Sequence, residues 1–125
     1  MRGLWIAGAT VLLAGCVGTP SLNGTIGAPA FAELQQSCGA VPTVDYGASA
    51  QSVYSTLFDA NVARRRGRIS QEEYCTFQTS LAQHYAAAAA SGTLQAQNDW
   101  AAYFLTQRVQ ALSWRAAVDP TLRGG

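Results

Sequence analysis

The side chains that could act as acids, bases or nucleophiles are few and widely spaced. His84 is the only histidine, and the sequence suggests no serine or cysteine nucleophile paired with it. Glu72 and Glu73 are adjacent, so on a helix their side chains point about 100° apart and form no carboxylate pair. No glycine-rich phosphate loop follows a strand pattern. The sequence therefore disfavours an enzyme, and His84 is interpreted as a surface or boundary residue.

The first sixteen residues have the features of an export signal. A positively charged start precedes an apolar run over residues 4–13, which is shorter than the roughly 20 residues that cross a bilayer. Leu13-Ala14-Gly15-Cys16 follows, with small residues that let a peptidase bind an extended backbone and a thiol that is the best nucleophile in the segment. This pattern resembles the lipobox of bacterial lipoproteins. The other interpretation is a buried N-terminal helix with an ordinary cysteine.

The resemblance to lipoproteins implies where the mature protein lies. Residues 1–15 would be removed as a signal peptide, and Cys16 would carry a thioether-linked diacylglycerol and usually an N-acyl chain. Several acyl chains anchor a protein far more firmly than one. Val17 stands where an aspartate tends to retain lipoproteins in the inner membrane. We therefore expect a lipid-anchored protein that faces the periplasm, with the outer membrane favoured over the inner.

The odd number of three cysteines has a simple interpretation once Cys16 is assigned to lipidation. Cys38 and Cys75 remain, and an even pair in an exported chain suggests a disulfide. Closing this loop would stabilise the fold by about 4 kcal/mol in the chain-entropy model. Two buried free thiols are the alternative. A zinc site is disfavoured because there is no CxxC motif or pair of histidines, and no cofactor is expected.

The rest of the chain divides into a tether and a helical body. Residues 16–48 are interpreted as the lipidated N-terminus and a tether, rich in Gly, Pro, Ser and Thr up to residue 30, with a short helix over 29–37. Residues 49–119 are predicted to form the domain, and 120–125 a disordered tail. The fold class predicted is all-α, a small three-helix bundle that contains an αα-hairpin.

Three long helices are predicted from apolar residues at helical spacing. They are expected over about 48–66, 71–90 and 94–118. Gly67 ends the first, Ser70 and Glu73 form a capping box at the start of the second, and Thr93 caps the third. The loop of two to three residues before Leu94 predicts an antiparallel hairpin.

The apolar faces of these helices predict the core. The first helix contributes Val53, Tyr54, Leu57, Phe58 and Val62, the second Tyr74, Phe77, Leu81, Tyr85 and Ala88, and the third Trp100, Phe104, Ala111 and Trp114, widened by Leu105, Val109 and Leu112. Tyr46, Tyr54 and Tyr103 are expected to be partly exposed. Such exposed aromatics would suit a protein interface, although a crowded core boundary explains them equally well.

The turn between the first two long helices resembles the second half of an EF-hand loop, with Gly67, Ile69 and Glu73 in matching places. The first ligand positions then fall on Val62, Arg64 and Arg66, which offer no carboxylate. The turn is therefore interpreted as a capped helix connection that does not bind calcium, and no metal site is predicted.

Four of the eight basic residues, all of which are arginines, lie together at this turn: Arg64, Arg65, Arg66 and Arg68. Cations at the C-terminal end of a helix stabilise it by about 0.3–1 kcal/mol each. On a lipid-anchored protein, the same patch could also contact anionic headgroups, lipopolysaccharide phosphates or an acidic partner. The whole chain has 8 basic and 7 acidic residues, so no strong field directs it to nucleic acid.

These observations favour a non-catalytic accessory or binding subunit of a cell-envelope assembly, with a protein partner in the envelope. The second hypothesis is a module that binds envelope lipid or polysaccharide through the arginine cluster and exposed tyrosines. A small enzyme is the third. The sequence indicates the location of the protein better than its task.

Overall fold

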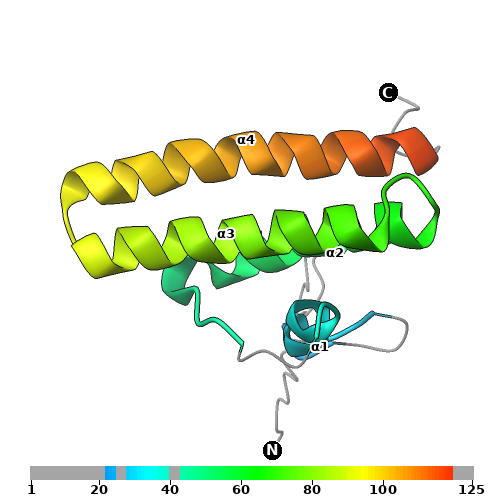
Figure 1. Cartoon of the computed structure of the whole chain (residues 1–125), viewed down its shortest axis with the longest axis horizontal. Coiled ribbons are helices and arrows are strands. Elements are labelled where there is room, and N and C mark those ends of the chain that lie inside the picture. The colour runs from blue at the N-terminus through cyan, green and yellow to red at the C-terminus, as the bar shows by residue number, and fades with distance from the viewer. Residues whose placement is uncertain (1–21, 25–27, 40–42, 120–125) are drawn as a thin grey trace, which may run out of the picture.

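A computed structural model describes residues 22–24, 28–39 and 43–119. The elements in these ranges are the helices α1 (Phe31–Gln36), α2 (Ala50–Arg65), α3 (Gln71–Ser91) and α4 (Leu94–Val118), with a short 3₁₀ helix, η1 (Gly47–Ser49). The predicted all-α bundle is confirmed, and so are the three long helices and the short one before them (Figure 1).

The bundle is built on the hairpin of α3 and α4, which run antiparallel (Figure 1). Only Gly92 and Thr93 connect them, as the short loop predicted. The 16-residue α2 packs against both helices of the hairpin, and α1 lies beside α2. Because α2 is shorter than α3 and α4, the closed end of the hairpin extends beyond it (Figure 1).

The helix ends follow from the side chains placed there. The capping box is present, since the Ser70 Oγ accepts from the Glu73 N–H at 3.0 Å and the Glu73 carboxylate accepts from the Ser70 N–H at 3.1 Å. Thr93 Oγ1 accepts from the Ala96 N–H at 3.1 Å and starts α4. Gly92 ends α3 at φ +67°, a left-handed conformation that glycine adopts without strain.

Seven of the seventeen residues predicted for the core are buried, and α2 contributes the largest share of the buried apolar residues. The buried apolar residues are Phe31, Leu34, Tyr46, Val53, Tyr54, Leu57, Ala60, Ala63, Ile69, Tyr74, Phe77, Leu81 and Ala111. The expectation that Tyr46 and Tyr54 are partly exposed is wrong, because only 1% and 0% of their surfaces are accessible. Each ring packs on Phe31, the first residue of α1. Burial raises the pKa of both Tyr46 and Tyr74 to about 12.

The prediction for α4 is wrong on one face. Leu105, Val109 and Leu112 were expected to widen the buried stripe, but they are 65%, 61% and 38% exposed. They lie outside the seam that Trp100, Phe104 and Ala111 make with the other helices. Helix α4 thus carries apolar side chains both toward the bundle and away from it.

The segment before α2 is attached to α3 by covalent and polar contacts. The predicted disulfide between Cys38 and Cys75 is present, with the two Cα atoms 5.5 Å apart. The Tyr74 hydroxyl donates to the Leu34 carbonyl at 3.1 Å, and Gln78 Nε2 donates to the Gln35 carbonyl at 2.5 Å. These contacts keep α1 against the bundle.

Two pieces of the predicted tether also contact the domain. The Phe31 N–H donates to the Leu22 carbonyl at 2.9 Å, and the Tyr54 hydroxyl donates to the Pro29 carbonyl at 2.6 Å. The predicted signal peptide, Cys16 and the tail over 120–125 lie outside the described residues. Among the helices that are described, none is both long and apolar enough to cross a membrane.

We predict that replacing both cysteines, in the variant Cys38→Ser/Cys75→Ser, lowers the free energy of unfolding by up to about 4 kcal/mol, because the unfolded chain gains entropy. Urea denaturation under non-reducing conditions measures the loss. Wild-type protein treated with a reductant should match the double variant. Equal midpoints for the oxidised wild type and the double variant would contradict a stabilising bridge.

Candidate functional site

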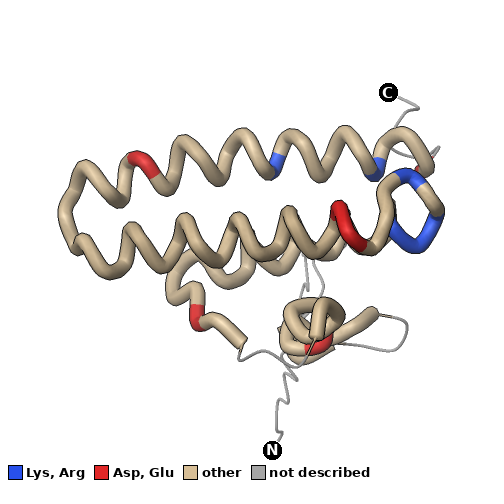
Figure 2. The backbone as a smooth tube through the Cα atoms, viewed as in Figure 1, with Lys and Arg blue, Asp and Glu red and all other residues tan. Residues whose placement is uncertain are grey.

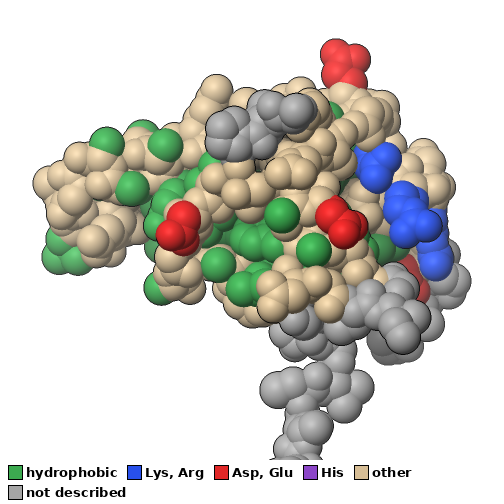
Figure 3. Space-filling model, turned by 90° about the horizontal axis from the view of Figure 1, so that it is seen from below, with side chains coloured by type: hydrophobic (Ala, Val, Ile, Leu, Met, Phe, Trp, Pro, Cys, Tyr) green, Lys and Arg blue, Asp and Glu red, His purple; other side chains and the backbone are tan. Residues whose placement is uncertain are grey.

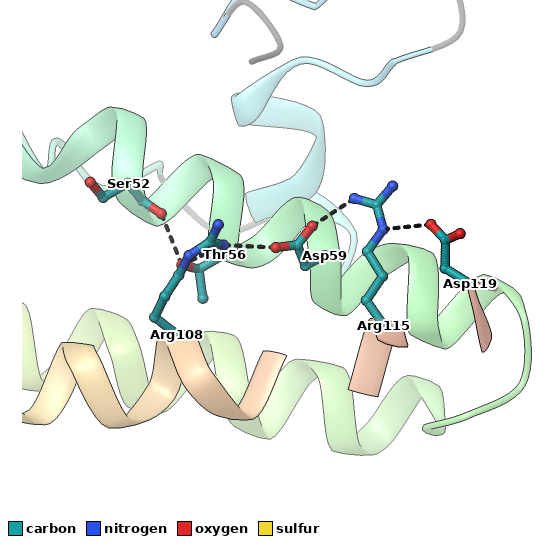
Figure 4. Close-up of polar contacts among 6 residues, drawn as sticks. All are labelled: Ser52, Thr56, Asp59, Arg108, Arg115 and Asp119. Atoms are coloured by element: carbon teal, nitrogen blue, oxygen red, sulfur yellow. Dashed lines mark hydrogen bonds and ion pairs between the residues drawn. The ribbon is translucent and has the colours of Figure 1, made fainter. Parts of the chain in front are cut away.

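An ion-pair network connects α2 with α4 (Figure 4). The Asp59 carboxylate on α2 accepts from Arg108 Nη1 at 2.7 Å and from Arg115 Nη1 at 2.6 Å, one oxygen for each guanidinium group. Arg115 also pairs with Asp119 through Nε at 3.3 Å and lies over the Phe58 ring. The Asp59 side chain is 9% exposed, so its charge is neutralised largely by protein groups.

The spacing of the two arginines explains why both reach one carboxylate. Arg108 and Arg115 are seven residues apart, which is two helical turns, so they project from the same face of α4. Thr56, one turn before Asp59, lies 3.5 Å from Arg108 Nη1 and extends the polar seam along α2 (Figure 4). Since α4 is apolar on two faces, these ion pairs select the face that meets α2.

With α4 rotated so that Arg108 and Arg115 face α2, a groove of about 600 Å³ opens between α3 and α4. Its lining residues are Ser70, Glu72, Glu73, Thr76, Phe77, Ser80, His84, Tyr103, Gln107 and Trp114. None of them belongs to α2, so the groove lies on a flank of the hairpin that α2 leaves uncovered. A concave surface of this size that combines aromatic rings with a few polar groups is typical of a binding site.

Two aromatic pairs form the apolar part of the groove. Phe77 meets Trp114 edge to face at 5.1 Å between centroids, and His84 stacks on Tyr103 at 3.6 Å. Phe77 and His84 are separated by two turns of α3, so the pairs lie about 10 Å apart along the helix. Burial raises the pKa of Tyr103, and its hydrogen bond with Ser80 opposes this increase. The hydroxyl therefore stays protonated and able to donate at neutral pH.

The polar part of the groove is acidic. Glu73 is committed to the capping box, whereas Glu72 is exposed and has no hydrogen bond or ion pair with another described residue. Among the described residues, no arginine lines the groove. Among the described residues there is also no group of three or more potential ligands that could hold a metal ion. The arrangement suits an uncharged or positively charged ligand with apolar parts.

The four clustered arginines lie at the opposite end from the α3–α4 loop (Figures 2 and 3). Arg64 contacts Asn61, Gln71 and the Tyr74 ring, and Arg66 donates to the Val118 carbonyl at 3.1 Å. These two side chains connect helices. Arg65 and Arg68 are exposed, and they present the positive charge of this end to the surroundings.

The described residues that the sequence predicted as sites, the disulfide cysteines and the arginine cluster, do not line the groove. His84 is exposed, as predicted, but it is part of the groove. The ion pairs of Asp59 with Arg108 and Arg115 were not predicted from the sequence. The sequence does contain one indication of these ion pairs: Arg108 and Arg115 are seven residues apart, so both lie on one face of a long helix. This spacing alone does not show which acidic residue they contact, because that depends on how α2 packs against α4.

Comparison with known proteins provides no relative from which a function could be transferred. No family model, curated protein or solved structure matches the chain. Only the chain's own residues and their geometry therefore indicate a function.

We predict that Asp59→Asn lowers the free energy of unfolding by about 2 kcal/mol, because it removes the charge that faces two arginines. The loss is less than that of a fully buried pair because the arginine side chains are 31% and 26% exposed and can regain water. Chemical denaturation measures it. The matched control is Asp99→Asn, at an exposed position on α4, with a change below about 0.5 kcal/mol. Equal midpoints for the two variants would contradict the structural role of Asp59.

Proposed function

We propose that the protein is a lipid-anchored, non-catalytic binding subunit of a bacterial cell-envelope assembly. The observation that carries the proposal is the open groove between α3 and α4, lined by two aromatic pairs and the free carboxylate of Glu72. The lipobox-like sequence that ends at Cys16 supports a lipid anchor with the domain in the periplasm, and Val17 favours the outer membrane over the inner.

The chemistry of the groove favours one class of partner. A partner segment with apolar side chains would cover the half-buried rings of Tyr103 and Trp114, and a lysine or arginine of the same segment would pair with Glu72. An acidic segment is disfavoured, because Glu72 and Glu73 line the groove and no cation among the described residues does. We therefore propose as partner an envelope protein that presents a basic, apolar segment.

A module that binds envelope polysaccharide is the second candidate. Two aromatic pairs about 10 Å apart, with hydroxyl and amide groups between them, could stack against two rings of a neutral sugar chain. This ligand would use Tyr103, as the sequence-based alternative supposed, but not the arginine cluster. An anionic lipid would instead use Arg65 and Arg68.

The anchor is tested by Cys16→Ser, which should move the protein from the membrane fraction to the soluble fraction, because the acylated thiol is lost. Fractionation of cells and immunoblotting measure the distribution. Val17→Ala serves as the control and should stay with the membranes. If Cys16→Ser still fractionates with membranes, the lipoprotein proposal is wrong.

The groove is tested by placing a photo-activatable phenylalanine derivative at Tyr103 in cells. We expect cross-links to one protein, at a peptide that contains lysine or arginine, because Tyr103 lines the groove. The variant Glu72→Lys should abolish these cross-links by charge reversal, whereas Glu33→Lys, which changes another exposed carboxylate on α1, should leave them unchanged. Cross-links only to polysaccharide would support the second candidate, and loss of cross-links only in Arg65→Ala/Arg68→Ala would contradict the groove.

A further inference from the structure

Helix α4 has an uncovered apolar face that belongs neither to the core nor to the groove. It contains Ala102, Leu105, Val109 and Leu112, and it ends at the half-buried Ala116. The three large side chains are between 38% and 65% exposed. Their spacing alternates between three and four residues, as in the seam of two packed helices. No described element of the chain covers this face.

The order of side chains on this face is the same from either end. Val109 is at the centre, a leucine lies on each side of it, and an alanine follows each leucine. An antiparallel second copy centred near Val109 would therefore place Leu105 beside the other Leu112, and Ala102 beside the other Ala116. The small alanines at the two ends let the helix backbones approach closely.

The charges of α4 are compatible with this packing. Between Ala101 and Ala117 the only charged residues are Arg108 and Arg115, and both are paired with Asp59 inside the same chain. A twofold contact consequently brings no like charges together on this face. Antiparallel α4 helices also align their dipoles favourably. Nothing on the face would orient a different, charged partner.

We propose that two copies of this protein associate through an antiparallel, twofold-symmetric contact between their α4 helices, centred near Val109. Such a contact is isologous, because each copy contributes the same surface. The two grooves remain open in the pair, since they lie on other residues of α4. The dimer does not depend on the partner proposed above.

Cysteine cross-linking of the full chain in cells distinguishes the arrangements. Val109→Cys should form a disulfide-linked dimer under mild oxidation, because the two thiols lie near the twofold axis. Ala102→Cys and Ala116→Cys should not link to their own kind, since each lies about 20 Å from its copy in the centred register. When these two variants are co-expressed, they should link to each other.

The control is Gln83→Cys, an exposed position on α3, which should remain monomeric. Thermal melting monitored by circular dichroism checks that each variant is folded. A monomeric Val109→Cys, or its cross-linking to a different protein, would overturn the proposal. So would self-linking of Ala102→Cys and Ala116→Cys, which indicates parallel helices. These readouts concern α4 alone, so they are independent of ligand binding in the groove.

Discussion

The ion pairs of Asp59 with Arg108 and Arg115 are the constraint on which both proposed binding surfaces depend. Hydrophobic burial alone does not choose the rotation of α4, because aromatic residues lie on one side of this helix and aliphatic residues on another. Two cations on one face and a single largely buried carboxylate on α2 make that choice. Any other rotation would leave Asp59 without its partners in a poorly solvated site.

The rotation of α4 about its axis determines which residues line the groove and which form the exposed aliphatic face. With its arginines directed to α2, the helix presents Tyr103, Gln107 and Trp114 to the groove and Leu105, Val109 and Leu112 to the outside. The disulfide between Cys38 and Cys75 has a different role, since it attaches the segment before α2 to α3. A small domain can therefore keep a modest core and still expose two separate surfaces, the groove and the aliphatic face of α4.

The sequence predicts the helices well because their signals are local. The capping box at Ser70, the two-residue turn before α4 and the pairing of Cys38 with Cys75 all follow from residue types and spacing. The rotation of α4 does not follow from local signals, because it depends on the Asp59 carboxylate, about fifty residues away in the chain. For this reason Leu105 was assigned to the core, and the groove, with lining residues on both α3 and α4, was missed.

The most direct test of this account is the thiol-labelling rate of Ala111→Cys, at a buried position of α4 next to the arginines. If the ion pairs fix the rotation of α4, adding Asp59→Asn should accelerate labelling while circular dichroism shows unchanged helix content. Leu81→Ala, which loses core contacts on α3, serves as the control for stability. Equal labelling rates in the Asp59→Asn and Asp59 backgrounds would show that apolar packing alone sets α4, and would contradict the account.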